Sequence, residues 1–157
     1  MKQTIYIIIA LAAIVLGSCK QKEWTEWKTQ NEIFLQENAK KDSVNTLPNG
    51  VQYKILYAGN PTATKPSNYS TVVCTYTAKL INGIVFDDQT NASLSLSSTI
   101  DGFASGIKQI HKTGDIIIYV PWQLGYGNNG SGTEGYSSYI PPYSTLIFRV
   151  HLSEITN

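Results

Sequence analysis

This 157-residue sequence lacks the residue patterns that indicate nucleic-acid binding, a metal site or a cofactor. The formal net charge is +1, and no cluster of Lys and Arg forms a basic stripe, so nucleic acid is not expected as a partner. The two histidines, His111 and His151, lie far apart without a Cys or Ser pattern beside them. Asp87 and Asp88 form an adjacent acidic pair, but neighbouring strand residues point to opposite faces, and no further ligands cluster with them. The sequence therefore predicts neither a metal site nor another cofactor.

Cysteine is also rare, with copies only at Cys19 and Cys74. If Cys19 is lipidated, as the sequence around it indicates (see below), Cys74 is the one thiol that remains. A single thiol cannot form an intrachain disulfide. Cys74 lies within the β-rich stretch TVVCTYTAKL and is expected to be a small buried strand residue. The glycine-rich stretch 127–139 lacks the Lys and the strand–loop–helix order of a phosphate-binding loop, so it is interpreted as a flexible loop.

No hydrophobic run is long enough for a comfortable membrane span, and the longest run lies near the N-terminus. Residues 5–16 are apolar, whereas a membrane-spanning helix needs about 20 such residues. Lys2 precedes this run and small residues follow it, which is the pattern of a secretory signal with a cleavage site. We therefore expect a signal peptide over residues 1–18.

The residue at the expected cleavage site is Cys19. The stretch Leu16-Gly17-Ser18-Cys19 resembles the bacterial lipobox, in which this cysteine is lipidated and becomes the first residue of the mature chain. Lys20 follows it, whereas an Asp there would resemble the signal for retention in the inner membrane. The resemblance implies a cell-envelope lipoprotein held at a membrane through lipidated Cys19, with the outer membrane favoured. A buried cysteine at the end of a helix is the alternative interpretation.

Residues 19–46 form a polar segment between the expected signal peptide and the main domain. Trp24 and Trp27 are three residues apart and Phe34 lies one face along, which indicates a short amphipathic helix. Such a helix could pack on the domain, pair with a second copy, or lie at the membrane surface beside the lipid, and the sequence does not distinguish these arrangements. The polar stretch KKDSVNT is interpreted as a linker, so the main domain is expected to cover residues 47–157.

The main domain alternates apolar and polar residues in the pattern typical of β-strands. The predicted strands lie in GVQYKILYAG, STVVCTYTAKL, IVFDD, DIIIYVP and TLIFRVHLSEI. Residues 81–83 mark a hairpin turn between the second and third of these. One stretch has helical spacing, with Phe103, Ile107 and Ile110 on one face and Gly114 as a C-terminal stop. One short helix among several antiparallel strands predicts an α+β domain in which the helix covers one face of the sheet.

Five segments of the domain are similar to the motifs of one known family and occur in the same order and at the same spacing as those motifs. They are TLPNGVQYKIL, VVCTYTAKLINGIVFDD, LSLSSTIDGFASGIKQIHKTGD, VPWQLGYGNNG and IPPYSTLIFRVHLSEI, which together extend over residues 47–155. These segments resemble the FKBP-type peptidyl-prolyl cis-trans isomerases, in particular the bacterial macrophage-infectivity-potentiator-like branch. The resemblance implies a bent antiparallel sheet wrapped around one short α-helix, with an apolar pocket between them. It further implies an isomerase that assists the folding of exported proteins, with proline-containing polypeptides as substrates and macrolides as inhibitors.

The resemblance also implies the residues of the pocket, position by position. The catalytic positions fall on Tyr76, Phe86, Asp87, Ile100, Phe103, Tyr126 and Phe148, and the substrate-binding positions fall on Leu94, Thr99 and Ile140. By the same analogy, the Ile100 N–H and the Tyr126 hydroxyl would hold carbonyl groups of the bound segment. Asp87 would hydrogen-bond within the pocket and orient Tyr76 or the ligand.

Some positions depart from the family pattern. Phe103 stands where the family usually has Trp, and Leu94 stands where an aromatic residue is common. The loop over 128–139 is longer than in minimal members, and Pro141-Pro142 at its end is expected to direct Ile140 toward the pocket. Three classes of function therefore stay open: an isomerase, a proline-binding chaperone of low activity, and an interaction lipoprotein that uses this loop or the Trp-containing segment.

Overall fold

The computed structural model describes residues 23–156 of the chain. The signal peptide expected over 1–18 and the lipidation site expected at Cys19 lie outside the described residues. Within residues 23–156, no helix has both the length and the apolar character that crossing a membrane requires.

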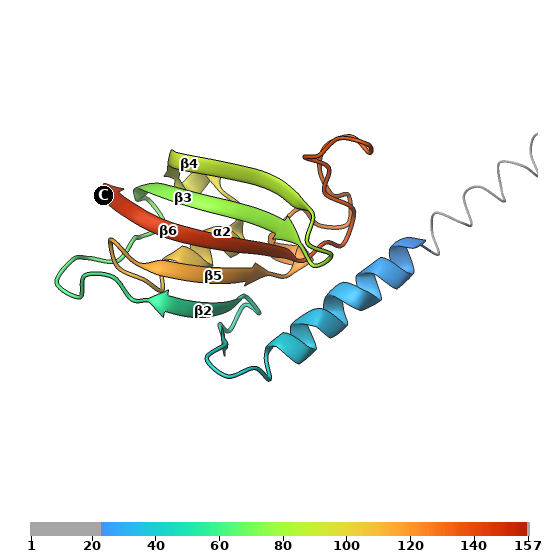
Figure 1. Ribbon diagram of the computed structural model, residues 1–157, viewed down its shortest axis with the longest axis horizontal. Helices are drawn as coiled ribbons and strands as arrows, with labels where there is room; N and C mark the ends of the chain where they lie inside the picture. Colours follow the sequence, from blue (N-terminus) through green and yellow to red (C-terminus); the bar gives the residue numbers. More distant parts are fainter. Residues whose placement is uncertain (1–22, 157) are drawn as a thin grey trace, which may run out of the picture.

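Six antiparallel strands form one sheet, whose order is β1-β2-β5-β6-β3-β4 (Figure 1). The strands are β1 (Asn45–Thr46), β2 (Gln52–Tyr57), β3 (Thr71–Leu80), β4 (Val85–Ser95), β5 (Asp115–Val120) and β6 (Leu146–Thr156). The helical elements are a helix over residues 23–38, η1 (Leu96–Ser98), α2 (Asp101–Ile107) and η2 (Trp122–Leu124). Helix α2 lies behind the sheet in Figure 1 and covers one of its faces. The predicted α+β architecture is confirmed.

One strand extends beyond its predicted stretch, and one further strand was not predicted. Strand β4 continues to Ser95, because residues 88–95 pair with β3 although most of their side chains are polar. Polar side chains are compatible with this place because β4 is an edge strand of the sheet. The segment interpreted as a linker ends in β1, which pairs with Gln52 and Tyr53 of β2.

Helix α2 is shorter than predicted, since it ends at Ile107 rather than near Gly114. The chain leaves the helical path where the His111 N–H donates a hydrogen bond of 2.9 Å to the Ala58 carbonyl. Ile110 is nevertheless fully buried, so its predicted place on the apolar face of this segment is confirmed although it lies beyond the helix.

Helix α2 packs closely on β5 because two of its glycines face the sheet. A Cβ atom at Gly102 would collide with the Val120 side chain, and one at Gly106 would collide with the Ile118 side chain. The absence of side chains at these positions brings the helix backbone near the sheet, which holds the residues carried by α2 against the strands.

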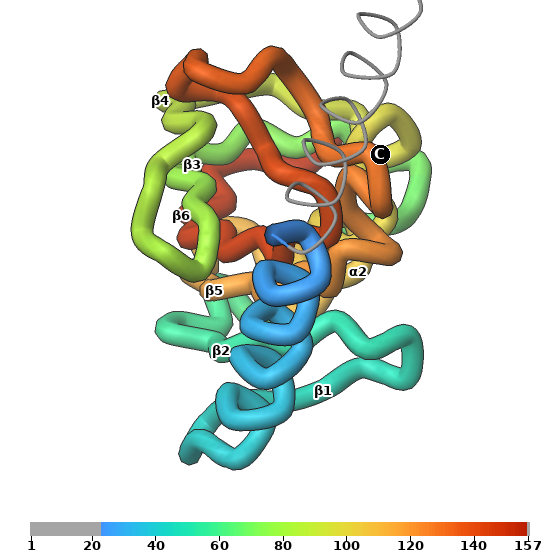
Figure 2. The backbone as a smooth tube through the Cα atoms, turned by 90° about the vertical axis from the view of Figure 1, so that its right-hand side faces the viewer, coloured from blue at the N-terminus to red at the C-terminus, as the bar shows by residue number. Residues whose placement is uncertain are grey.

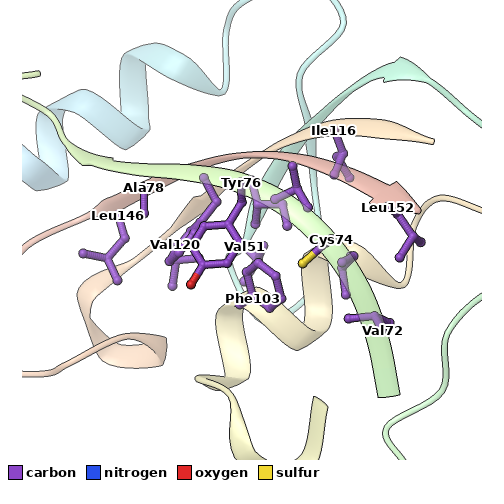
Figure 3. Close-up of a cluster of buried hydrophobic side chains, with 14 of the residues drawn as sticks. Val51, Val72, Cys74, Tyr76, Ala78, Phe103, Ile116, Val120, Leu146 and Leu152 are labelled. Carbon is purple, nitrogen blue, oxygen red and sulfur yellow. The ribbon is translucent and has the colours of Figure 1, made fainter. Parts of the chain in front are cut away.

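The hydrophobic core fills the space between α2 and the inner face of the sheet (Figure 3). Its strand residues occupy alternate positions of β3, β5 and β6: Val72, Cys74, Tyr76, Ala78, Leu80, Ile116, Ile118, Val120, Leu146, Phe148, Val150 and Leu152. Cys74 is fully buried, as predicted, and burial raises the pKa of its thiol to about 11. The two-residue period of the sequence thus separates an inner face from an outer face.

The helix over residues 23–38 packs on the end of the sheet at which β6 begins (Figures 1 and 2). Trp27 Nε1 donates a hydrogen bond of 3.0 Å to Ser144 Oγ, and the Thr145 N–H donates one of 2.7 Å to Asn31 Oδ1. Asn31 is fully buried, and its Nδ2 donates to the Trp27 carbonyl. Of the arrangements that the sequence left open, the structure shows packing on the domain.

Further contacts hold the C-terminal end of the same helix. Gln52 Nε2 on β2 donates a hydrogen bond of 2.8 Å to the Leu35 carbonyl, and Gln52 Oε1 accepts one of 2.9 Å from Asn38 Nδ2. The Phe34 ring lies 6.1 Å from the ring of Tyr119 on β5. Buried amides that bond in this directional way place the helix in one position relative to the sheet.

Removal of the Asn31 amide tests this anchoring. Asn31→Ala should lower the free energy of unfolding by about 1–3 kcal/mol, because the buried Thr145 N–H loses its acceptor. Gln36 is exposed on the same helix, so Gln36→Ala should change the free energy of unfolding by less than about 0.5 kcal/mol. Urea denaturation followed by circular dichroism measures both values. Equal effects of the two substitutions would contradict the anchoring by Asn31.

Candidate active site

A pocket of about 300 Å³ opens at the inner face of the sheet. Its walls consist of Tyr76, Phe86, Asp87, Leu94, Ser98, Thr99, Ile100, Phe103, Tyr126 and Phe148. This set contains every pocket position predicted from the sequence except Ile140, and it adds Ser98. The residues come from β3, β4, η1, α2, β6 and the loops that follow η1 and η2, so only the folded chain brings them together.

The strand register places the side chains of the pocket. Ala78 on β3 lies opposite Phe148 on β6 and opposite Asp87 on β4, and its small side chain leaves space between its neighbours. The register between β3 and β4 shifts after Ala78, so Phe86 is an extra residue on β4. Such a bulge interrupts the alternation of a strand, which explains why the adjacent residues Phe86 and Asp87 both line the pocket.

Aromatic rings form the floor of the pocket around Phe148. The Phe103 ring lies 5.3 Å from the Phe148 ring at 69°, and the Phe86 ring lies 6.1 Å from it at 89°. The Tyr76 ring is 6.0 Å from Phe103 and 6.2 Å from Phe148 (Figure 3 shows Tyr76 beside Phe103). Edge-to-face packing of this kind is favourable beyond the area that it buries. Phe103 and Phe148 are 3% and 6% exposed, so very little of the floor is open to water.

One hydrogen-bonded carboxylate lies in the wall of this apolar pocket. The Tyr76 hydroxyl donates a hydrogen bond of 2.7 Å to Asp87 Oδ2, and Gln89 Nε2 donates one of 2.9 Å to Asp87 Oδ1. Burial raises the pKa of Tyr76 above its ordinary value, and the hydrogen bond to Asp87 and its negative charge raise it further. Burial and then the charge of Asp87 also raise the pKa of Tyr126. Both phenols therefore stay protonated at neutral pH.

Two hydrogen-bond donors of the pocket have no acceptor within the described part of the chain. The Ile100 N–H precedes the first turn of α2, and the Tyr126 hydroxyl belongs to a side chain that is 40% exposed. Both residues line the pocket. An apolar floor with two donors near its rim can bind a segment that has an apolar ring and neighbouring carbonyl groups.

Ile140 does not line the pocket, and its expected place there is corrected. Its side chain is 4% exposed and packs in the hydrophobic core. The backbone groups of Ile140 and Ser131 exchange hydrogen bonds of 2.8 and 2.9 Å, which close the loop between them. Pairing with Ser131 turns Ile140 inward, and Pro141-Pro142 follows at the surface of the loop.

Ser98 lines the pocket but was not predicted from the sequence. It belongs to η1, a single turn without a two-residue or helical period, and the family resemblance assigned no pocket role to this position. Its position directly before Thr99 and Ile100 is the one signal that could have indicated it. Thr99 itself uses its hydroxyl internally, since Oγ1 donates a hydrogen bond of 3.0 Å to the Leu96 carbonyl.

Comparisons of the sequence with known families agree with this fold. A model described as FKBP-type peptidyl-prolyl cis-trans isomerase matches residues 62–153, and a model described as the domain amino terminal to FKBP-type peptidyl-prolyl isomerase matches residues 10–55.

Relatives of known name are similar over most of the chain. This chain is 35% identical over 132 residues to the probable FKBP-type peptidyl-prolyl cis-trans isomerase FkpA of Neisseria meningitidis. The matched region covers 82% of this chain and 46% of the relative. This chain is also 34% identical over 138 residues to the outer membrane protein MIP of Legionella longbeachae. This match covers 85% of this chain and 56% of the relative. The chain thus spans about half the length of these relatives.

Solved structures have the same fold. The crystal structure of FkpA from Escherichia coli superimposes with a TM-score of 0.83 at 29% identity, over 99% of this chain and 71% of that chain. A peptidyl-prolyl cis-trans isomerase from Pseudomonas syringae superimposes with a TM-score of 0.75 at 24% identity, over 85% of this chain and 96% of that chain.

The pH dependence of stability should reveal the buried Tyr76 phenol. Because its folded-state pKa is raised, this phenol stabilises the fold fully below its ordinary pKa of 10.0, and the contribution is lost as the pH rises through the folded-state value. Tyr76→Phe should lower the free energy of unfolding at neutral pH by about 1–3 kcal/mol, because Asp87 loses a donor. Above about pH 10, the free energy of unfolding of the Tyr76→Phe protein should fall less steeply with pH than that of the wild type. The two slopes should differ by up to about 1.4 kcal/mol per pH unit.

Urea denaturation at several pH values measures this difference. Tyr136 is 71% exposed, so Tyr136→Phe is the control and should follow the wild-type profile throughout. Identical alkaline slopes for the wild type and Tyr76→Phe would contradict the burial of a titrating phenol at position 76.

Proposed function

Because the chain belongs to the family of FKBP-type peptidyl-prolyl cis-trans isomerases, in its macrophage-infectivity-potentiator-like branch, we propose that it accelerates the cis–trans isomerisation of X-Pro bonds in exported polypeptides. The observation that carries the proposal is a pocket with an aromatic floor and one internally bonded carboxylate, Asp87. A compact, apolar prolyl ring fits such a floor, whereas a charged or strongly polar group would lose its hydration there.

The chemistry of the reaction explains why such a pocket is sufficient. An X-Pro bond interconverts in tens to hundreds of seconds without a catalyst, and its barrier is about 18–20 kcal/mol because resonance gives the C–N bond partial double-bond character. Twisting the bond breaks this resonance and reduces the charge separation within the amide. A dry apolar pocket therefore stabilises the twisted amide relative to the planar one, which lowers the barrier.

The residues of the pocket divide this task between them. Phe103 and Phe148 would hold the prolyl ring, since they form the buried floor. The Ile100 N–H and the Tyr126 hydroxyl would donate hydrogen bonds to carbonyl groups on either side of the twisting bond, since neither has an acceptor within residues 23–156. No covalent bond of the substrate breaks, so catalysis requires orientation and desolvation only.

A proline-binding chaperone of low activity is the second candidate. Phe103 has a smaller ring than the Trp that is usual in the family and lacks an indole N–H, and Leu94 lines the wall where an aromatic residue is common. These changes reduce aromatic contact with the twisted amide, whereas binding of an extended proline-containing segment needs less precise contact.

A protease-coupled assay with a proline-containing tetrapeptide tests the isomerase proposal. The purified protein should raise the isomerisation rate above the uncatalysed rate, and a macrolide inhibitor of the family should lower it again. Asp87→Ala should reduce kcat/KM about ten- to hundredfold, because a hydrogen bond to a charged group in the pocket contributes about 1.5–3 kcal/mol. Asp88→Ala should leave kcat/KM within about twofold of the wild type.

Asp88 is a matched control because it is the adjacent carboxylate and lies outside the pocket, where it accepts a hydrogen bond from Thr77. Equal losses in the two Asp variants would show that the pocket is assigned wrongly. A protein that binds the macrolide without accelerating isomerisation would favour the chaperone candidate.

We further propose that the protein is a lipoprotein of the cell envelope, attached to a membrane through Cys19, and that it acts on polypeptides outside the cytoplasm. The support is the sequence pattern of residues 1–19 and the similarity to a relative named outer membrane protein MIP. The outer membrane is the favoured site because Lys20 replaces the Asp of the inner-membrane retention signal.

Substitution of the lipidated residue tests this attachment. Cys19→Ala should move the protein from the membrane fraction to the soluble fraction and should abolish labelling by a radioactive fatty acid. Cys74→Ala, which removes the other cysteine, should remain in the membrane fraction and retain the label, because the Cys74 thiol is buried in the core. Continued membrane fractionation of the Cys19→Ala protein would contradict lipid anchoring.

A further inference from the structure

The outer face of the sheet carries a groove of about 410 Å³, on the side opposite the pocket. Strand β3 contributes to both sites, because its residues alternate between the two faces. Tyr76 lines the pocket on the inner face, whereas Thr77 and Lys79 line the groove on the outer face. Figure 1 shows the sheet from this outer side, with α2 behind it.

The floor of the groove is apolar. Ile117 of β5 and Ile147 of β6 lie side by side with Tyr119, which is directly opposite Ile147 in the register. The helix over residues 23–38 closes one side with Phe34, whose ring lies 6.1 Å from that of Tyr119. The groove therefore forms only because this helix packs on the domain.

The rim of the groove is positively charged. Lys41, Lys79 and Arg149 all line it, and none of them forms an ion pair with a carboxylate within residues 23–156. Lys54 adds a further positive charge, since it lies opposite Ile117 in the register and therefore on the same face. Two carboxylates lie on the same face: Asp88, which accepts a hydrogen bond of 3.2 Å from Thr77, and Asp115 of β5, whose Oδ1 lies 3.1 Å from His151 Nδ1. The surroundings of the apolar floor thus have an excess of positive charge.

One polar atom in the wall of the groove is also unsatisfied. Asn38 is 1% exposed, and its Nδ2 donates to Gln52, but its Oδ1 has no hydrogen-bond partner in the described part of the chain. This oxygen is closed to solvent, so Asn38 belongs to the fixed wall of the groove and is not presented to a ligand.

From these features we propose that the groove is a second polypeptide-binding site, which takes acidic segments with apolar side chains. The floor would receive an aromatic or aliphatic side chain, and flanking Asp or Glu carboxylates would pair with Lys79 and Arg149, the latter through the two parallel hydrogen bonds that a guanidinium can donate. The floor combines aliphatic Ile117 and Ile147 with the ring of Tyr119, which suits an aliphatic or aromatic side chain. A polypeptide held here lies on the opposite face of the sheet from the pocket, so the two sites can bind independently.

Fluorescence anisotropy with a labelled, proline-free peptide of alternating Glu and Phe residues tests the proposal. The absence of proline makes the measurement independent of isomerase activity. Lys79→Glu and Arg149→Glu should each weaken binding about tenfold or more, because each replaces an attraction by a repulsion. Lys65→Glu makes the same change of net charge at an exposed lysine that bonds to the Gln109 carbonyl, and it should leave the affinity within about twofold.

Two further measurements distinguish a specific peptide-binding site from non-specific electrostatic attraction of polyanions. A peptide of alternating Glu and Ser residues should bind much more weakly than the Glu–Phe peptide, and nuclear magnetic resonance should show Glu–Phe binding at the Ile117 and Ile147 methyl groups but not at Ile100. Equal affinities for the two peptides, or equal binding of a poly-dT oligonucleotide, would overturn the proposal in favour of a general polyanion surface. Equal losses in the Lys65→Glu and Lys79→Glu proteins, or shifts at Ile100 instead of Ile117, would overturn it as well.

Discussion

The antiparallel pairing of β3 with β6 is the constraint on which both faces of this sheet depend. In this register Ala78 lies opposite Phe148 on the inner face, and Thr77 lies opposite Arg149 on the outer face. The first pair makes space for the pocket and supplies its floor, while the second belongs to the basic groove. A shift of the register by one residue would exchange the two faces, because side chains alternate along a strand. It would place a guanidinium in the core and an aromatic ring in water.

The helix over residues 23–38 is held to this sheet by buried amides as well as by apolar contacts. Asn31 and Gln52 each form hydrogen bonds with backbone carbonyl or N–H groups across the interface between helix and sheet. Apolar surfaces can slide over one another at little cost, whereas a buried amide loses its bonds when it moves. This difference explains how a short helix keeps one position, and why Phe34 reaches Tyr119 and completes the groove.

Most of the pocket could be predicted from the sequence. The family resemblance supplied the positions of Tyr76, Phe103 and Phe148, and the two-residue period of the strands and the helical spacing around Phe103 agree with the face that each side chain takes. Ile140 could not be placed in this way, because its burial results from pairing with Ser131 across a loop that has no period. Ser98 was missed for the same reason, since it belongs to a single turn. The extent of β4 was also missed, because its polar residues hide a strand that only its pairing with β3 defines.

The sequence by itself determined the α+β class and the faces of the main strands, because these depend on repeats of two and about four residues that are local to each segment. It also indicated the family, through five motif segments that occur in the family's order and spacing. Only the tertiary structure decided which side chains became neighbours. Lys41, Lys79 and Arg149 are too far apart in the sequence to form a basic stripe, yet strand pairing and helix packing place them around one groove. In the same way, the bulge at Phe86 turned two adjacent residues into one pocket wall. Register and packing are non-local, so a pattern within a single segment cannot specify them.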